Sequence, residues 1–363
     1  MDIKLETPIQ LKTIQLKNRI VMAPMCMYQS DDDGMAKKFH EAHYYMHALG
    51  GIGLVMVEAT AIEKDGRISF KDLGIWSDDH IKGLSVISNG IKEAGSVSCI
   101  QINHAGRKAV GNHIIGPSTI KMDGKDQLPQ EMTLDQIKET IWSFRQAARR
   151  AHEAGFDMIE IHAAHGYLIS QFMSPLSNQR TDRYGQKHQF LKEVIESIYE
   201  VWPSDKSISI RISGTEYHPE GFDIDDVIHI LKSCDLSRID LIHISSGGNV
   251  RPQVMNFEEG YQLPLARKIK ESCRIPTIGG GLITNVMIGN QALYNDDCDL
   301  VFYGRLLLRD PFYFLRNIEQ LEFPEPYKRG KLYHNKRRQH ENICRWHDCI
   351  RKINSCKKTW TNT

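Results

Sequence analysis

Two histidines and a tyrosine cluster within the segment 160–167. His162 and His165 are three residues apart, and Tyr167 follows two residues later. Imidazole N–H groups can polarise a carbonyl oxygen, and a phenol with an ordinary pKa of about 10 stays protonated at neutral pH. The spacing therefore predicts donors that bind a substrate oxygen and deliver a proton. A metal site is the alternative, but it needs a third protein ligand, and the sequence contains neither an HExxH motif nor a carboxylate triad.

The elements around this cluster can be inferred from apolar spacing. Residues 156–161 are mostly apolar and follow a glycine, which is typical of a short buried strand. Residues 134–153 repeat apolar side chains on one helical face, and Thr133 and Gln136 have the spacing of a capping box at its start. The cluster is therefore expected where a strand ends.

The same alternation of strand and helix extends along the chain. Strands are predicted at 20–23, 53–58, 98–102, 156–161, 207–212, 241–245, 276–279 and 300–303. Helices are predicted at 40–49, 79–94, 134–153, 189–201, 224–233, 260–272, 284–293 and 311–320. Eight such units imply a parallel sheet with right-handed crossovers, and eight strands close a (β/α)8 TIM barrel. An open doubly wound sheet is the alternative. Alternation within 8–18 predicts a short N-terminal hairpin.

Composition limits the class of protein. The 363 residues are 41% apolar and 25% charged, as in globular proteins, and the net charge of +1 does not indicate nucleic-acid binding. No apolar run approaches the roughly 20 residues that span a bilayer, and the first residues lack an apolar signal region. A cytoplasmic protein without a membrane partner is expected. The eight cysteines form no disulfide framework and are expected to be thiols.

The end of the chain differs from the rest in composition. We predict one domain at 1–330 and a basic extension at 331–363, which contains nine Lys/Arg against two Asp/Glu. The histidines and cysteines of this extension match no standard zinc pattern. A loosely docked tail without a metal is therefore expected.

In a TIM barrel the chemistry lies at the carboxyl ends of the strands. A triple glycine that includes Gly280 and Gly281 follows the seventh predicted strand, and Gly304 and Arg305 follow the eighth. Loops at these positions commonly bind phosphate, because glycines let backbone N–H groups approach an anion and arginine adds a bidentate partner. The alternative is that the glycines only form tight turns. Their combination with Arg305 favours phosphate binding.

Three further strand ends carry residues that suit a redox cofactor. Arg211 could form a salt bridge, or it could stabilise the negative charge of a reduced flavin around N1 and O2. The amide of Gln101 matches the donors and acceptors of the flavin's imide edge. Cys26 is either a small buried apolar residue or a thiol that hydrogen-bonds a cofactor and tunes its potential. No neighbouring base marks it as a nucleophile.

Four segments carry a more specific signal, namely 17–28, 104–108, 154–167 and 304–305. They resemble the Old Yellow Enzyme family of NADH:flavin oxidoreductases, or FMN-dependent ene-reductases, and in particular the bacterial class with a Cys in the first strand-end motif. The resemblance covers about 1–330. It implies a TIM barrel that binds FMN noncovalently at its mouth and uses NADPH or NADH as reductant.

The resemblance also implies roles for individual residues. Those implied to contact the isoalloxazine or ribityl chain are Ala23, Pro24, Met25, Cys26, Ala59, Gln101 and Arg211, and those implied to contact the phosphate are Gly280, Gly281, Gly304 and Arg305. His162 and His165 would bind a carbonyl or nitro oxygen. Tyr28 would line the pocket, and Lys108 would lie at the flavin's edge. After NAD(P)H reduces the flavin, hydride would pass to the β-carbon of an α,β-unsaturated compound, and Tyr167 would protonate the α-carbon.

The chain departs from the family pattern at two places. After Gly185 it continues directly into 186–190, so that a loop is shortened and its arginine is absent. Near the end, Arg329 would reach into a neighbouring subunit's substrate site, which implies a homo-oligomer, either a dimer or a tetramer. Lys331 replaces the aromatic residue that usually follows the Arg-Gly pair.

Other functions stay open on the sequence alone. Flavin-dependent reductive cleavage or demethylation could use the same scaffold, although no cluster-forming cysteine run follows the barrel. A cofactor-free lyase or isomerase acting on a phosphorylated substrate would need a Schiff-base lysine or a carboxylate base, and neither stands clearly at a strand end. A flavin store or sensor would leave the His–His–Tyr donors without a role. The physiological substrate and the choice between NADH and NADPH do not follow from the sequence.

Overall fold

A computed structural model describes residues 3–328 except 13, 123, 126 and 251–256. The chain divides into two compact units, 1–318 and 319–363. In the second unit the described residues contain one short turn, η4 Glu325–Tyr327. The predicted boundary at 330 and the basic extension after it lie outside the described residues.

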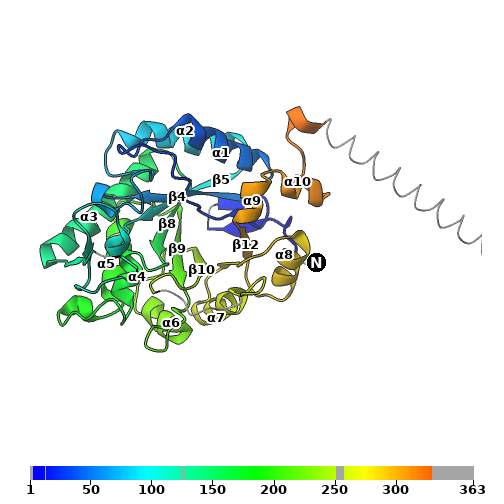
Figure 1. The fold of residues 1–363 in the computed structure, drawn as a ribbon. Coiled ribbons are helices and arrows are strands. Elements are labelled where there is room, and N and C mark those ends of the chain that lie inside the picture. Colours follow the sequence, from blue (N-terminus) through cyan, green and yellow to red (C-terminus); the bar gives the residue numbers. More distant parts are fainter. Residues whose placement is uncertain (1–2, 13, 123, 126, 251–256, 329–363) are drawn as a thin grey trace, which may run out of the picture. The chain divides into compact units, whose positions relative to one another are not determined.

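Eight parallel strands close into a barrel with helices around it (Figure 1). In their order around the barrel the strands are β10 Leu241–Ser245, β11 Thr277–Gly279, β12 Leu300–Tyr303, β3 Ile20–Met22, β4 Leu54–Ala61, β5 Val97–Asn103, β8 Met158–Ala163 and β9 Ser207–Ser213. Because the sheet closes on itself, the predicted TIM barrel is confirmed and the open doubly wound sheet is excluded. β4 continues beyond its predicted end, so that Ala59 belongs to a strand and not to a loop.

The longer helices lie where apolar spacing placed them. They are α1 Lys38–Leu49, α2 His80–Glu93, α3 Leu134–Glu153, α5 Gln189–Tyr199, α6 Ile224–Lys232, α7 Leu263–Cys273 and α8 Val286–Tyr294. The capping box of α3 is formed, since Thr133 Oγ1 accepts from Gln136 N at 3.2 Å and Gln136 Oε1 accepts from Thr133 N at 2.9 Å. Polar groups that would otherwise lack partners at this helix end are thereby satisfied.

Two regions differ from the predicted helices. The helix predicted at 311–320 is shorter than expected, α10 Tyr313–Asn317, and an unpredicted short helix, α9 Arg305–Arg309, precedes it. Asp310 between them has extended backbone angles, because a residue that precedes proline is disfavoured in the helical region. A further short helix, α4 Leu168–Met173, follows Tyr167 directly and is buried at every position. Because every residue of α4 is buried, its sequence lacks the alternation of apolar and polar faces from which a helix can be predicted.

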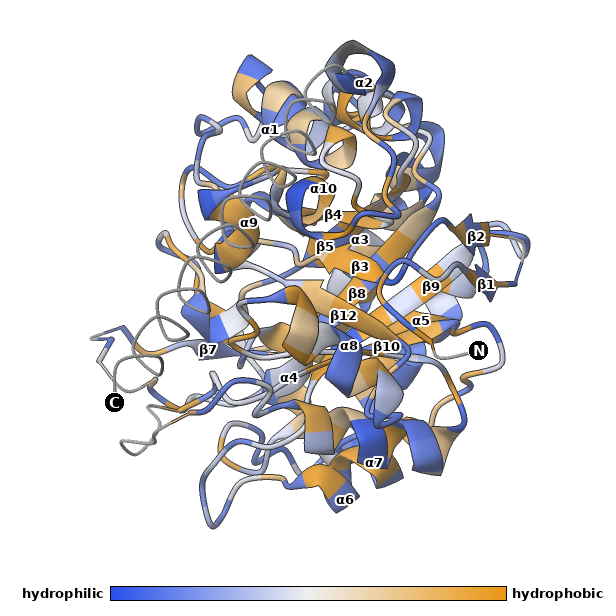
Figure 2. Cartoon of the chain, turned by 90° about the vertical axis from the view of Figure 1, so that its right-hand side faces the viewer, coloured by the Kyte–Doolittle hydropathy of each residue, from blue (hydrophilic) through white to orange (hydrophobic). Residues whose placement is uncertain are grey.

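An apolar layer fills the amino-terminal end of the barrel. The hairpin of β1 Ile9–Leu11 and β2 Ile14–Leu16 confirms the predicted one, and it contributes Leu11 and Leu16 to this layer. The barrel strands supply the rest, with Val21, Leu54, Met56, Cys99, Met158, Leu241, Ile278 and Leu300. In Figure 2 the hydrophobic colour is concentrated in the strands, whereas outer helices such as α6 and α7 alternate in colour. The apolar layer leaves the carboxyl-terminal half of the barrel for polar side chains.

Short elements complete the described chain. A two-stranded sheet pairs β6 Ile115–Gly116 with β7 Gln130–Glu131. The 3-10 turns are η1 Lys64–Gly66, η2 Gly106–Lys108 and η3 Arg183–Gly185. Within the described part of the chain, no helix combines the length and apolarity that crossing a bilayer requires.

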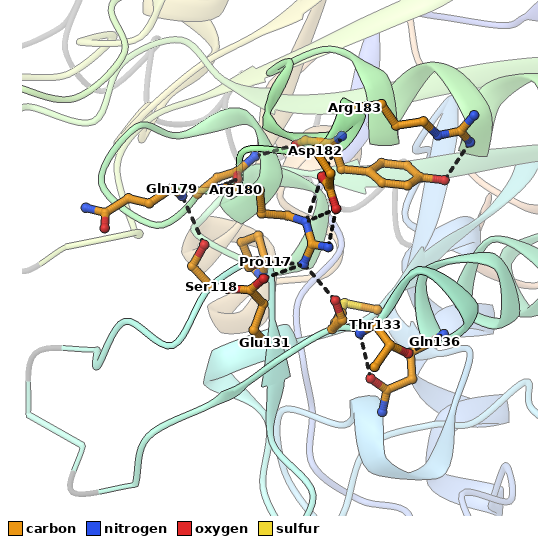
Figure 3. Close-up of polar contacts among 12 residues, drawn as sticks. Pro117, Ser118, Glu131, Thr133, Gln136, Gln179, Arg180, Asp182 and Arg183 are labelled. Atoms are coloured by element: carbon orange, nitrogen blue, oxygen red, sulfur yellow. Dashed lines mark hydrogen bonds and ion pairs between the residues drawn. The ribbon is translucent and has the colours of Figure 1, made fainter.

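The segment 180–182, which precedes the loop predicted to be shortened, is tied to the segment before α3 (Figure 3). The Arg180 guanidinium pairs with Asp182 and also donates to the backbone oxygens of Met132 at 2.7 Å and Pro117 at 3.1 Å. One planar five-donor group thus holds three segments together. The segment that leads into η3 is therefore fixed by polar contacts.

Candidate active site

Strand register brings the polar residues of four neighbouring strands side by side. Gln101 of β5 is paired with Glu160 of β8, which is paired in turn with Ser209 of β9. Two residues further along, Arg211 lies between His162 of β8 and His243 of β10. Since side chains alternate with period two along a strand, Glu160 and His162 share the inward side of β8 with the apolar-layer residue Met158. The barrel interior therefore changes from apolar to polar toward the carboxyl ends.

The predicted donor cluster forms at this end. The ring centroids of His162 and His165 are 5.1 Å apart, those of His162 and Tyr167 are 4.9 Å apart, and those of His165 and Tyr167 are 6.4 Å apart. His162 is the penultimate residue of β8 and is buried, whereas His165 and Tyr167 are half-buried in the turn before α4. His165 has a φ of +60°, in the left-handed region, which turns its ring back toward His162.

Hydrogen bonds determine which nitrogen of each histidine faces the open end. His162 Nδ1 accepts from Ala164 N at 3.2 Å, so its proton is on Nε2. His165 Nε2 lies 2.6 Å from Ser245 Oγ, and Gln262 Nε2 donates to the same hydroxyl oxygen at 3.3 Å. The Ser245 O–H is then free to donate to His165 Nε2, which leaves the His165 proton on Nδ1. Each ring therefore keeps one N–H for a ligand.

The protonation states suit this role. Burial lowers the pKa of His162 and His165 well below the ordinary value, and the positive charge of Arg211 lowers both further. Burial raises the pKa of Tyr167 far above the ordinary value. The cluster therefore holds two neutral imidazoles and a protonated phenol at neutral pH, which is the arrangement needed to bind an oxygen and supply a proton.

Lys108 supports the cluster from η2. Its Nζ donates to the backbone oxygens of His165 and Gly248, both at 2.8 Å, and lies 4.9 Å from the ring centroid of Tyr167. Burial, with the charge of Arg107, lowers the pKa of Lys108 to about 8. The resemblance implied a place for Lys108 at the flavin's edge; the contacts show that it fixes the turn that carries His165 and Tyr167.

The loop after β3 carries Cys26 and Tyr28. The Tyr28 hydroxyl donates to the Cys26 sulfur. Burial raises the pKa of Cys26 above that of an ordinary thiol, and the charge of Glu58 raises it further. Cys26 is therefore a neutral thiol without an activating base. Tyr28 has a φ of +54° and keeps 41% of its surface exposed, so its ring is available to a ligand.

A cavity of about 510 Å³ opens between the carboxyl ends of β9 to β12, and its wall includes Ser245, the partner of His165. Of the predicted cofactor residues, its wall contains Arg211, Gly281, Gly304 and Arg305. The wall also contains residues that the sequence analysis did not single out as site residues: Ser245, Glu259, Tyr261, Gln262, Leu282, Ile283, Thr284, Phe302, Leu306 and Arg309. Arg309 follows Arg305 by one helical turn, a spacing that could have indicated it.

The residues of this cavity fit FMN. Arg211 is buried, and its Nε atom has no hydrogen-bond partner among the described residues, so it suits an acceptor on a ligand. An added Cβ would lie 2.7 Å from the Phe302 ring at Gly280 and 2.8 Å from the Tyr261 ring at Gly281, which also has a φ of +100°. Both positions therefore require glycine for close packing against these rings, and Gly281 also lies in the cavity wall.

The remaining residues predicted to contact FMN or substrate lie at several strand ends and differ in burial. Ala23 and Pro24 are buried at the end of β3, Ala59 is buried within β4, and Met25 is half-buried. An added Cβ at Gly304 would lie 3.4 Å from Met25 Sδ, which brings the loops after the first and last barrel strands together. Arg329 lies outside the described residues. Among those that are described, no group of three or more metal-binding side chains converges.

Comparison with known proteins identifies the family of this chain. The sequence profile described as the NADH:flavin oxidoreductase / NADH oxidase family matches residues 4–323, and the chain belongs to this family. The chain is 49% identical over 331 residues to an NADPH dehydrogenase of Bacillus velezensis, covering 89% of this chain and 97% of the relative. It is 47% identical over 337 residues to an NADPH dehydrogenase of Bacillus subtilis, covering 90% and 99%.

Solved structures agree as well. An Old Yellow Enzyme homologue from Zymomonas mobilis superimposes with a TM-score of 0.74 at 25% identity, covering 88% of this chain and 94% of that one. Morphinone reductase superimposes with a TM-score of 0.77 at 24% identity, covering 90% and 92%, which supports the fold alone. The protein is thus an oxidoreductase that uses FMN and a nicotinamide cofactor, as the sequence analysis predicted.

Proposed function

We propose that this protein is an NADPH dehydrogenase that reduces the activated C=C bond of α,β-unsaturated carbonyl or nitro compounds. The observation that carries the proposal is the pair of neutral imidazoles beside a protonated phenol, next to a cavity that fits FMN. The names of the Bacillus relatives favour NADPH as reductant. When bound, FMN accepts a hydride from the nicotinamide and supplies it to the substrate.

The residues of the cluster divide the work on the substrate. His162 Nε2–H and His165 Nδ1–H donate to the substrate oxygen and stabilise the negative charge that develops there when the β-carbon receives hydride. Two such donors contribute about 3 kcal/mol each if they resemble oxyanion-hole groups. Tyr167 then gives its proton to the α-carbon, and the phenolate regains a proton from solvent. The substrate gains two electrons and two hydrogens.

Lys108 assists Tyr167 in this scheme. Its ammonium group lies over the ring of Tyr167 and would stabilise the phenolate that remains after proton transfer. A homo-oligomer in which Arg329 reaches a neighbouring site stays a prediction, as do a cytoplasmic location and the pocket role of Tyr28.

The test is Tyr167→Phe, followed by separate measurement of the two half-reactions in a stopped-flow instrument. We expect reoxidation of the flavin by an enone to slow by about 10²–10⁴-fold, because the proton donor is lost. Flavin reduction by NADPH should change little, since that step requires no proton from Tyr167.

A matched control is Tyr199→Phe, which removes a phenol whose hydroxyl donates to Asp235 O on the outer surface. It should leave both half-reactions as they are. Equal slowing of the two half-reactions in Tyr167→Phe would argue against a role for Tyr167 as proton donor.

A further inference from the structure

A buried carboxylate lies beneath the proposed flavin site. Glu160 has no exposed surface, and each of its oxygens has a defined partner. Oε1 accepts from Gln101 Nε2 at 2.7 Å, and Oε2 accepts from His243 Nδ1 at 2.9 Å and from Ser209 Oγ at 3.1 Å. A charge in this position requires such partners, because removing a carboxylate from water is unfavourable.

The carboxylate is ionised. Burial alone would raise the pKa of Glu160, but His243, the positive charge of Arg211 and the Gln101 amide together hold it below the ordinary value. Burial lowers the pKa of His243 although the charge of Glu160 raises it, and His243 Nδ1 donates to the carboxylate. His243 and the cation Arg211 are therefore the main groups that keep Glu160 charged.

This arrangement fixes the orientation of Gln101. A carboxylate can only accept hydrogen bonds, so the NH₂ group of Gln101 must face Glu160 and its carbonyl oxygen must face away. The imide edge of a flavin presents the N3–H donor between two carbonyl oxygens. An amide held in this orientation offers its oxygen to N3–H, whereas a freely rotating amide would offer either end.

Glu160 also moderates Arg211. The Arg211 Nε atom has no partner among the described residues and suits the N1 and O2 edge of a flavin. Reduced flavin carries negative charge at that edge, and a nearby cation favours the reduced form. The negative charge of Glu160 partly cancels the field of Arg211, and so it limits how strongly reduced FMN is favoured over oxidised FMN.

We propose that Glu160 is a positioning residue for FMN, which orients Gln101 for the imide edge and sets the flavin's reduction potential by opposing Arg211. This inference rests on FMN binding in the barrel and not on the identity of the alkene. In this proposal Glu160 contacts neither the substrate nor FMN and acts through Gln101 and Arg211.

The first test is Glu160→Gln in the holoenzyme, which removes the charge and keeps the shape. We expect reduced FMN to be favoured about tenfold more over oxidised FMN, which is a rise of about 30 mV in midpoint potential for this two-electron couple. The potential is measured by equilibrium reduction against a reference dye. Release of FMN on dilution, followed by its fluorescence, gives the affinity of the oxidised form.

The second test is Glu160→Leu, which removes the acceptor for Gln101 as well as the charge. Here we expect the same rise in potential together with about tenfold weaker binding of oxidised FMN. Ser209→Ala is the matched control, since it removes one hydrogen bond to Glu160 but neither the charge nor the contact with Gln101. Its potential and its FMN affinity should equal those of the unmodified enzyme.

The outcomes separate a positioning role from a structural one. A structural role would weaken both redox forms equally and leave the potential unchanged in Glu160→Gln, and that result would overturn the proposal. If neither variant retains flavin, Glu160→Asp decides: its shorter side chain keeps the charge, so the potential should hold while oxidised FMN binds more weakly. An unchanged FMN affinity in Glu160→Asp would then refute the orientation of Gln101 by Glu160. None of these measurements depends on enone reduction, so their results are independent of the proposed substrate.

Discussion

Glu58 and Glu160 are both fully buried glutamates of the same barrel, yet their pKa values shift in opposite directions. Burial raises the pKa of Glu58 to about 7, whereas the pKa of Glu160 lies below its ordinary value. Desolvation acts on both in the same sense. The difference must therefore come from their neighbours, because Glu160 has the His243 imidazole hydrogen-bonded to it and the cation Arg211 nearby, and Glu58 has neither.

The surroundings of Glu58 contain no compensating cation among its named partners. Its Oε2 accepts from Met27 N at 2.8 Å, and its Oε1 accepts from Tyr44 Oη at 3.0 Å. His40 of the same helix as Tyr44 lies 3.8 Å away, but burial lowers its pKa to about 4, so it is neutral. The nearby acid Asp72 raises the pKa of Glu58 further.

The position of Glu58 links this titration to the site. Met27, whose backbone it holds, lies between Cys26 and Tyr28. The titratable groups that face Glu58 are His40 and Tyr44 from α1, Cys26 and Tyr28 from the loop after β3, and Asp72 from the segment after η1. Glu160 thus stays charged beneath the proposed flavin site. Glu58 changes its charge near neutral pH beside the loop that carries Cys26.

The largest expected effect on stability comes from removing the cation near Glu160, so that, like Glu58, it has no compensating positive charge. Arg211→Met removes the cation and leaves a buried carboxylate uncompensated, which destabilises by about 3–5 kcal/mol. We expect this loss in full at pH 8 and a smaller one at pH 5, since Glu160 can then take up a proton. Urea titrations at both pH values measure the free energy of unfolding.

Arg211→Lys is the control for that experiment, because it retains a positive charge and loses the same guanidinium contacts. Its loss of stability should be smaller and nearly independent of pH. If Arg211→Met and Arg211→Lys lose the same amount at both pH values, Arg211 does not compensate Glu160.

A slightly smaller effect is expected from neutralising Glu58. Its pKa is raised from an unfolded value near 4.5 to about 7, so its contribution to stability is fully present below about pH 4.5 and is lost as pH rises through 7. A shift of this size corresponds to about 3 kcal/mol. In Glu58→Gln the unfolding free energy, relative to the unmodified protein, should therefore rise by about 3 kcal/mol between pH 5 and pH 8.

The comparison with the unmodified protein also removes the contribution of Asp72, whose pKa burial raises to about 6 and which titrates in both proteins. Glu63→Gln is a contrasting variant, because the contacts of Glu63 with His104 lower its pKa although it is largely buried. That variant should not gain stability as pH rises. A flat difference between Glu58→Gln and the unmodified protein across this range would refute the raised pKa of Glu58.

The two glutamates also show what a sequence can and cannot predict. The barrel followed from local signals, since apolar periodicity and the capping box at Thr133 depend on residues a few positions apart. The strand ends then indicated His162, Tyr167 and Arg211, because every parallel strand delivers its last residues to the same face. These signals required no knowledge of which strands are neighbours.

The partners of the two glutamates depended on long-range register. Glu160 was visible in its motif, but its hydrogen bond to His243 joins residues 83 positions apart, and it exists only because β8, β9 and β10 are adjacent. Gln262 likewise reaches the site because the helix predicted from 260 begins at Leu263 and leaves it in the preceding turn. Proline at 311 was a readable signal for the break between α9 and α10.

The smallest effect sharpens the comparison at Cys26. Burial is the main cause of the raised pKa of this thiol and the charge of Glu58 is the next, so Glu58→Gln removes only the second contribution. Removing the Glu58 charge lowers the pKa of Cys26, so the thiolate fraction rises. We expect iodoacetamide to alkylate Cys26 faster at pH 8.5 in this variant, measured by mass spectrometry of the peptide. Cys234, whose pKa is also raised by burial but without Glu58 nearby, provides the internal control and should react at the same rate in both proteins. An equal acceleration of both thiols would indicate a general loosening of the structure, and no acceleration of Cys26 would show that Glu58 carries no charge at that pH.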